Sequence, residues 1–107
     1  VYTINEPAAA GGYQAISAAG LTDQITMGSI DGSCTGVANV KAGQIGATVM
    51  QFPKKMAEQS VDAVVVYAGS GTKPSGFINT GSQLITDKPA AGVPSQDTTW
   101  GAENCWG

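Results

Sequence analysis

The chain has 107 residues, only 12% of them charged, and its 5 Lys and Arg against 8 Asp and Glu give a net charge of −3. This length predicts at most one domain, and the acidic balance argues against a nucleic-acid partner, because phosphate binding needs a basic face. The sequence has no histidine, the commonest metal ligand and general base, so we expect no metal, no cofactor and no enzyme.

The start of the chain is abrupt. Val1 lies within a strand-like run, with no methionine before it and no signal peptide. Domains rarely begin in this way, so we expect a piece of a longer protein, produced by processing, proteolysis or truncation. Part of any binding site would then lie outside this sequence.

Strands and helices alternate over the first two thirds of the chain. Strands are expected over residues 1–5, 25–30 and 45–50, and helices over residues 8–19, from a cap at Asp31 or Ser33 to about residue 42, and over residues 54–68. Pro7 and Pro53 suit the first turn of a helix, and Gly20 and Gly43 suit the position after the last turn. The third helix is hydrophobic nearly all round over residues 61–67, which is typical of burial on more than one side.

The rest of the chain is less regular. Residues 69–74 have the composition of a loop, two short strands are expected at 77–80 and 83–86, and irregular structure follows Asp87. The resulting order is β-α-β-α-β-α-β, and connections of this length favour parallel strands joined by right-handed crossovers. The predicted fold class is therefore α/β, with a small open parallel sheet in a three-layer arrangement.

The two cysteines, Cys34 and Cys105, are too few for a disulfide scaffold, and their spacing fits no zinc motif. They are either two unrelated thiols or one bridge that fastens the C-terminal tail to the helix after Asp31. The tail is polar except for two Trp and would fray unless it were fastened. A bridge would stabilise the fold by roughly 4 kcal/mol in the chain-entropy treatment and would indicate an oxidising compartment.

Three predicted strands end on a hydrogen-bonding side chain that is followed by a helix-start signal: Asn5, Asp31 and Gln51. Ligands of open α/β sheets bind outside the carboxyl ends of the strands. The two amides donate and accept hydrogen bonds, and the ionised carboxylate accepts two hydroxyl protons in charge-assisted bonds. This set suits a neutral polyhydroxyl compound. It suits a phosphate poorly, because no Lys, Arg or glycine-rich nest accompanies it.

Each of these residues also has a purely structural interpretation. Asn5 can cap the first helix, Asp31 can cap the second, and Gln51 can be an ordinary surface glutamine. Two further functions then stay open. Asp31 with Glu6 could form an acid–base pair in a small enzyme, or the chain could be a structural piece without a ligand.

The pattern resembles the C-terminal third of type I periplasmic sugar-binding proteins, the ribose- and fructose-type proteins that serve ABC importers. The matching motifs are Asn-Glu-Pro at 5–7, Gly-Ser-Ile-Asp-Gly at 28–32 and the run from Val40 to Pro53. The resemblance covers residues 1 to about 87, and the terminal Cys-Trp-Gly is similar to the fructose-type branch. In this family the equivalent asparagine, aspartate and glutamine bond sugar hydroxyls, which implies these roles for Asn5, Asp31 and Gln51. Where the family often has an aromatic residue before the aspartate, this chain has Ile30, so an acyclic polyol fits as well as a pyranose.

The resemblance also implies two lobes that close on a monosaccharide or polyol, a periplasmic or extracellular location, and an ABC transporter permease as partner. Residues 1–51 would belong to the C-terminal lobe, residues 52–80 to the other lobe, and residues 81–107 would form a crossover strand and a disulfide-stapled tail. Most of the other lobe would lie in a missing N-terminal part of the same protein. We therefore predict very weak sugar affinity for this chain alone, and self-association or folding back of its third helix.

The effector-binding domain of a LacI-type transcription repressor is the main alternative. It resembles the same family in fold and in the position of its ligand site. Such repressors are cytosolic, so an oxidised Cys34–Cys105 pair would argue against this alternative.

Overall fold

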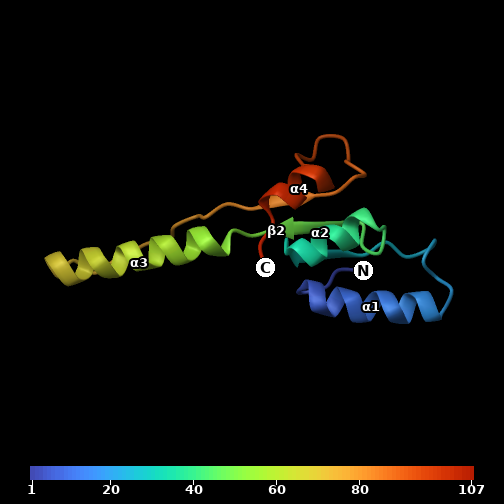
Figure 1. The fold of residues 1–107 in the computed structure, drawn as a ribbon, viewed down its shortest axis with the longest axis horizontal. Helices are drawn as coiled ribbons and strands as arrows, with labels where there is room; N and C mark the ends of the chain where they lie inside the picture. Colours follow the sequence, from blue (N-terminus) through green and yellow to red (C-terminus); the bar gives the residue numbers. More distant parts are fainter. The chain divides into compact units, whose positions relative to one another are not determined.

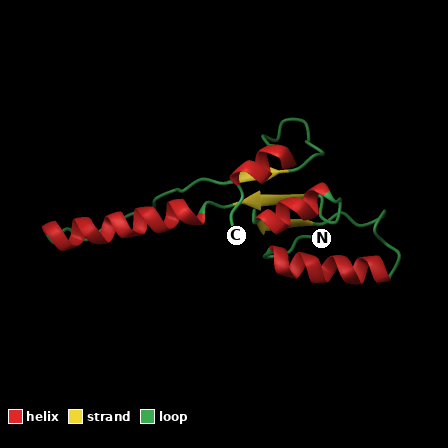
Figure 2. Cartoon of the chain, in the orientation of Figure 1, coloured by secondary structure: helices red, strands yellow, loops and turns green.

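The computed structural model describes all residues, Val1–Gly107, and the chain divides into two compact units (Figures 1 and 2). Unit 1 comprises Val1–Gln51 and Ser82–Gly107, and unit 2 comprises Phe52–Gly81. Unit 1 contains the sheet and the helices α1, α2 and α4, whereas unit 2 contains the long helix α3 and the segment that follows it. None of the helices has the length and apolar character that crossing a membrane requires.

The sheet of unit 1 is small and mixed. Its strands β1 (Gly28–Asp31), β2 (Ala47–Met50) and β3 (Gln83–Ile85) lie in the order β1-β2-β3. β1 and β2 are parallel, with Ile30 opposite Val49, and β3 is antiparallel to β2. The α/β class is thus confirmed, and the carboxyl ends of β1 and β2 meet at one edge.

The predicted fully parallel β-α-β-α-β-α-β sheet is wrong in three respects. Residues 1–5 contribute only an isolated bridge between Tyr2 and Gly28, because side chains such as Ile4, 79% exposed, have no covering layer to hold a strand. β3 runs antiparallel, because the chain re-enters the sheet at the edge where β2 ends, with Gln83 opposite Met50. Residues 77–80 form no strand, because unit 2 offers a helix and no strand to share backbone hydrogen bonds.

The first two helices form where the sequence predicts them. α1 (Glu6–Ala18) is capped by Asn5 and α2 (Cys34–Lys41) by Ser33, whose side-chain oxygens accept hydrogen bonds from backbone N–H groups of the first turn. Both helices are followed by a glycine with positive φ, at positions 20 and 43, as their C-terminal signals indicate.

The core of unit 1 has two parts. One joins the first two helices to the segments that lead into the strands: Ala9, Met27, Val40 and Ile45, with Tyr13 and Ile16 packed against them. In the other, α4 (Thr98–Asn104) packs on α2 so closely that a side chain at Gly101 would lie 3.0 Å from both Val37 and Ile85. The helix α4 corrects the prediction of an irregular tail.

The predicted Cys34–Cys105 disulfide is confirmed. The two Cα atoms lie 4.9 Å apart, and the backbone N–H of Cys34 donates to the carbonyl of Trp106 at 3.0 Å. An isolated bridge between Ser33 and Trp106 adds to this attachment. The C-terminal tail is therefore fixed to the start of α2, next to the end of β1.

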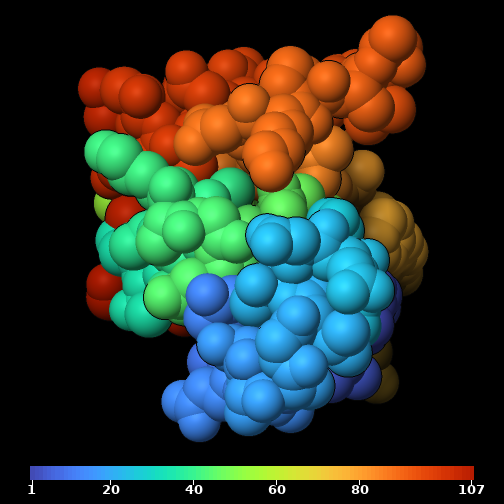
Figure 3. Space-filling model, turned by 90° about the vertical axis from the view of Figure 1, so that its right-hand side faces the viewer, coloured from blue at the N-terminus to red at the C-terminus, as the bar shows by residue number.

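Loops close the end of unit 1 that lies opposite the carboxyl ends of β1 and β2 (Figure 3). Gly46 N–H, before β2, donates to the carbonyl of Met27 at 2.7 Å. The hydroxyl of Thr86, after β3, donates to the carbonyl of Gly46 at 2.8 Å. These bonds join the three loops, which are shown in light blue, green and orange.

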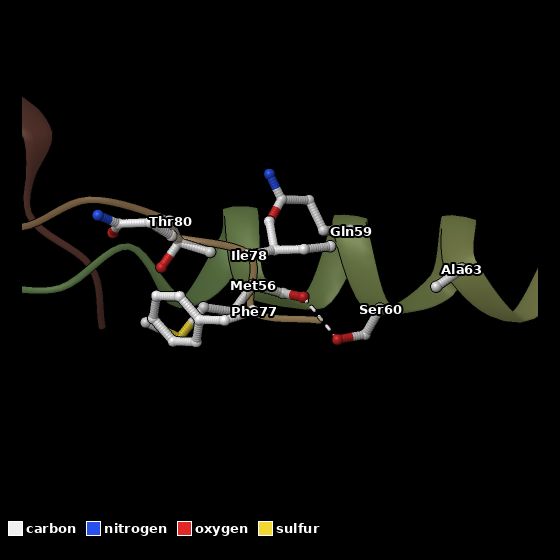
Figure 4. A pocket seen from close by; sticks show the side chains of 8 residues that line it. Met56, Gln59, Ser60, Ala63, Phe77, Ile78 and Thr80 are labelled. Atoms are coloured by element: carbon white, nitrogen blue, oxygen red, sulfur yellow. Dashed lines mark hydrogen bonds between the residues drawn. The ribbon is translucent and has the colours of Figure 1, made fainter. Parts of the chain in front are cut away.

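Unit 2 is a single helix with an extended segment beside it. The helix α3 (Pro53–Ser70) has no buried residue, and its valines are largely exposed, Val64 by 65%. Phe77 and Ile78 lie along the helix over Met56 and Gln59 (Figure 4). They line a shallow groove of about 430 Å³. Unit 2 has no core of its own.

Candidate binding site at the carboxyl edge of the sheet

Two of the three predicted ligand residues are in direct contact. The side-chain Nε2 of Gln51 donates to Asp31 Oδ1 at 3.3 Å, and the backbone N–H of Gln51 donates to the Asp31 carbonyl at 2.9 Å. The second carboxylate oxygen, Oδ2, accepts from the backbone N–H of Glu6 at 3.2 Å, the residue that follows Asn5. All three predicted side chains are partly exposed, so the structure brings them to one accessible edge.

The side-chain amide of Asn5 has one atom that caps a helix and one that makes no hydrogen bond within the protein. Its Oδ1 accepts from the backbone N–H of Ala8 at 2.9 Å and caps α1. Its amide nitrogen makes no hydrogen bond to the protein, so two N–H donors are available. The cap fixes the side chain and so orients these donors without consuming them.

Asp31 is held in an unusual backbone conformation. It is the only residue other than glycine with a positive φ, at 143°, and such conformations persist only where the surrounding structure enforces them and cluster at ligand sites. The next residue, Gly32, has a φ of 75°, and a side chain there would collide with Met50. The cap of α2 is Ser33 and not Asp31, so the carboxylate of Asp31 is not occupied by that helix.

The carboxylate of Asp31 keeps open acceptor capacity. An ionised carboxylate offers about four lone-pair positions, and the protein uses one on each oxygen, for Gln51 and for the N–H of Glu6. The remaining positions can accept hydroxyl protons in charge-assisted hydrogen bonds. The edge therefore combines a free carboxylate acceptor with the amide donors of Asn5.

Glu6 has a role that the sequence analysis missed. Only 5% of it is exposed, and its two carboxylate oxygens accept four hydrogen bonds. These come from Gly32 N–H at 2.9 Å, Ser33 N–H at 3.1 Å, the Ser33 hydroxyl at 2.5 Å and the Thr48 hydroxyl at 2.6 Å. Glu6 thus joins α1, the turn after β1 and β2, and it is not available as the acid–base partner of Asp31.

Two features of the sequence could have indicated this buried carboxylate. Thr48 stands in the middle of an otherwise apolar strand, where a buried hydroxyl needs a polar partner. Gly36 stands inside a helix, where glycine is unfavourable, and a side chain at this position would overlap the Glu6 carboxylate. Both residues are explained by the space and the donors that Glu6 needs.

Trp106 is the second residue that the sequence analysis did not connect with the site. Its indole Nε1–H donates to the backbone carbonyl of Asp31 at 3.0 Å, and 38% of the residue is exposed. The chain's C-terminus accordingly lies at the carboxyl end of β2 in Figures 1 and 2. The expected disulfide could have indicated this contact. It joins Cys105, the residue before Trp106, to Cys34, which lies three positions after Asp31.

Comparison with known proteins finds similar solved structures. No protein-family model and no curated protein matches the chain. Among solved structures, a galactofuranose-binding protein matches 80% of the chain at 35% identity and a TM-score of 0.72. An ABC transporter solute-binding protein from Agrobacterium vitis with bound D-fucose matches 80% of the chain at 34% identity and a TM-score of 0.66. The resemblance to sugar-binding solute-binding proteins of ABC transporters is confirmed.

A third solute-binding protein extends the comparison. It is a carbohydrate transporter protein from Agrobacterium radiobacter in complex with D-arabinose, which matches 81% of the chain at 26% identity and a TM-score of 0.66. The chain spans 29% of the length of each of these three solute-binding proteins. One of the three is named as a galactofuranose-binding protein, and the other two are named as solute-binding proteins that hold a sugar.

Proposed function

We propose that the chain is part of a solute-binding protein that captures a sugar or polyol and delivers it to an ABC importer, with Asn5, Asp31 and Gln51 as ligand residues. The observation that carries the proposal is the partly exposed Asp31 carboxylate, oriented by Gln51 and by the N–H of Glu6, with acceptor positions to spare. The names of the structural neighbours support a sugar as the ligand. The permease of the importer is the implied partner.

The disulfide supports the proposed location in the periplasm or outside the cell. Structural disulfides form and persist in oxidising compartments and are rare in the cytosol. The Cys34–Cys105 bridge therefore argues against a cytosolic LacI-type repressor. The alternative of a small enzyme is weakened because the Glu6 carboxylate is already bonded to four donors.

A sugar titration followed by ¹H–¹⁵N NMR tests the function. Methyl galactofuranoside, D-fucose and D-arabinose are added to the chain, with L-fucose as a control of equal size and hydroxyl number. We expect saturable shifts of the Asn5 side-chain amide and the backbone amides of Asp31 and Gln51 for at least one sugar. We expect a dissociation constant in the millimolar range, because this edge supplies only part of the hydrogen bonds of a closed site.

Two results would contradict this expectation. Equal, non-saturating shifts with every sugar and with L-fucose would remove the proposed site. Micromolar binding by the chain alone would instead show that no second lobe is needed, and would remove the proposal that the site is half of a larger one.

We also propose that residues 1–51 belong to the C-terminal lobe, residues 52–80 to the other lobe, and residues 81–107 to a returning crossover and a stapled tail. The division of the chain after Gln51 and after Gly81 supports this assignment. So does the exposed apolar surface of α3, where Val61 and Val64 are 61% and 65% exposed, because such patches mark interaction surfaces. The proposed cover is the N-terminal part of the same protein.

The groove of unit 2 gives a second indication of a missing cover. The side-chain oxygen Oε1 of Gln59 is buried there without a hydrogen-bond partner. A buried polar atom without a partner is rare in native structures and requires an explanation. A donor from the covering lobe would supply one.

In the isolated chain, we expect α3 to find a substitute partner, most simply a second copy. Size-exclusion chromatography with light scattering should give a dimer or larger species at micromolar concentration. Val64→Lys should shift it to monomer, because a charge is costly to bury in an apolar interface. Asp62→Lys, also on α3 but at a residue that is already polar, should not. A strictly monomeric wild type with well-protected α3 amides in hydrogen exchange would refute this.

A further inference from the structure

The indole of Trp106 lies at the same edge as the proposed sugar ligands, although it comes from the far end of the chain. Its Nε1–H donates to the carbonyl of Asp31 at 3.0 Å, so the ring begins one hydrogen bond away from the residue that holds the central carboxylate. We propose that Trp106 forms an apolar wall of the sugar site and selects ligands that present a C–H face. This inference rests on the proposed function and adds a specificity-determining residue to it.

The ring is fixed before any ligand arrives. The Cys34–Cys105 bridge holds the preceding residue, the Trp106 carbonyl accepts from Cys34 N–H at 3.0 Å, and the indole N–H is bonded to Asp31. A chain end is usually poorly ordered unless it is tied down. Three attachments within two residues leave the indole little freedom to lose on binding, which favours affinity.

The chemistry that remains exposed on Trp106 is apolar. The only polar atom of the side chain is already used by the Asp31 carbonyl, so the indole has only carbon atoms left to offer a neighbour, and 38% of the residue is exposed. Aromatic rings combine a large apolar surface with a negative face that attracts polarised C–H groups. A sugar that gives its hydroxyls to Asp31 has a C–H face left to contact such a ring.

The position also accounts for Ile30, the aliphatic residue directly before Asp31. At this position the chain lacks the aromatic residue that a stacking site would need. Trp106 brings an aromatic ring to the residue that follows Ile30, through its hydrogen bond to the Asp31 carbonyl. The disulfide then has a second role beside stability, because it holds a recognition residue in place.

The test uses the same NMR titration with D-fucose on the whole chain. The indole ¹H–¹⁵N signal of Trp106 should shift together with the amides of Asp31 and Gln51, whereas that of Trp100, on α4, should stay. Trp106→Ala should weaken binding about tenfold, and Trp106→Phe, which keeps an aromatic face, should weaken it less. Trp100→Phe is the matched control and should bind as the wild type does. Thermal unfolding of each variant checks that the fold persists.

Removal of the disulfide gives a second, independent test of the role of Trp106. The double variant Cys34→Ser, Cys105→Ser should weaken sugar binding in the wild-type background, because it releases Trp106. It should have no further effect in the Trp106→Ala background. A merely stabilising bridge would act equally in both backgrounds, which would overturn the positioning role.

The outcomes separate this inference from the function on which it rests. If Trp106→Ala binds within twofold of the wild type while the Asp31 and Gln51 amides still respond to sugar, the wall is refuted and the function stands. If no amide at this edge responds to any sugar, the proposed function fails and the inference fails with it.

Discussion

Replacing Glu6 by glutamine is expected to lower the free energy of unfolding by about 3 kcal/mol or more, the largest stability effect of any single substitution that we predict. Glu6 is 5% exposed, and its carboxylate accepts four hydrogen bonds. An amide has only one acceptor oxygen. Its NH₂ group would face N–H and hydroxyl donors, at least one of which would be buried without a partner.

Urea unfolding followed by circular dichroism measures this effect, and a graded series tests its cause. Thr48→Val removes one donor to Glu6 and keeps the volume, so it should cost about 1–2 kcal/mol. Glu103→Gln, at an exposed glutamate of α4, is the matched control and should change stability by less than about 0.5 kcal/mol. A Glu6→Gln variant as stable as the Glu103→Gln control would show that the buried network contributes little.

The sequence alone predicts those elements whose signals are local. Both the Asn5 cap and the glycines at 20 and 43 mark helix ends by their own chemistry. The disulfide was predictable because a polar tail with a single cysteine has few other means of attachment. The contact between Asp31 and Gln51 followed from a rule of topology, since the carboxyl ends of parallel strands share an edge.

The parts that were not predictable depend on partners far away in the chain. Strand propensity at residues 77–80 could not reveal that no neighbouring strand is present in unit 2. The direction of β3 depends on the edge of the sheet at which the chain re-enters it, and the three residues of the strand carry no signal for that edge. The role of Glu6 depends on donors from two other segments, and that of Trp106 on a contact 75 positions away along the chain.

The carboxylates of Glu6 and Asp31 lie at the same edge of the sheet but differ in burial and in hydrogen bonding. Glu6 is buried and bonded to four donors, so it shapes the turn after β1. Asp31, the last residue of β1, is partly exposed and its side chain accepts two hydrogen bonds. Glu6 holds the backbone directly after Asp31, through the N–H groups of Gly32 and Ser33. It thereby supports the positive φ of Asp31. Stability and recognition are therefore predicted to respond to different substitutions, although the residues are joined through the N–H of Glu6.

Asp31→Asn is expected to weaken sugar binding about 100-fold while the chain stays folded. The substitution removes the charge and one acceptor oxygen. Two charge-assisted hydrogen bonds to sugar hydroxyls would each lose roughly 1.5 kcal/mol, and 1.4 kcal/mol corresponds to a factor of ten in affinity. The cost to stability is limited to the 3.2 Å bond from Glu6 N–H, about 1 kcal/mol.

The NMR titration with D-fucose measures this loss, and its expected result is the absence of saturation of the Gln51 amide at sugar concentrations that saturate the wild type. Asp23→Asn is the matched control, because Asp23 is exposed in the turn before β1; this variant should bind sugar as the wild type does. Urea unfolding of Asp31→Asn must show a cooperative transition for the comparison to count. Binding of Asp31→Asn within threefold of the wild type would remove the Asp31 carboxylate from the proposed site, because the amide has neither the charge nor the second acceptor oxygen.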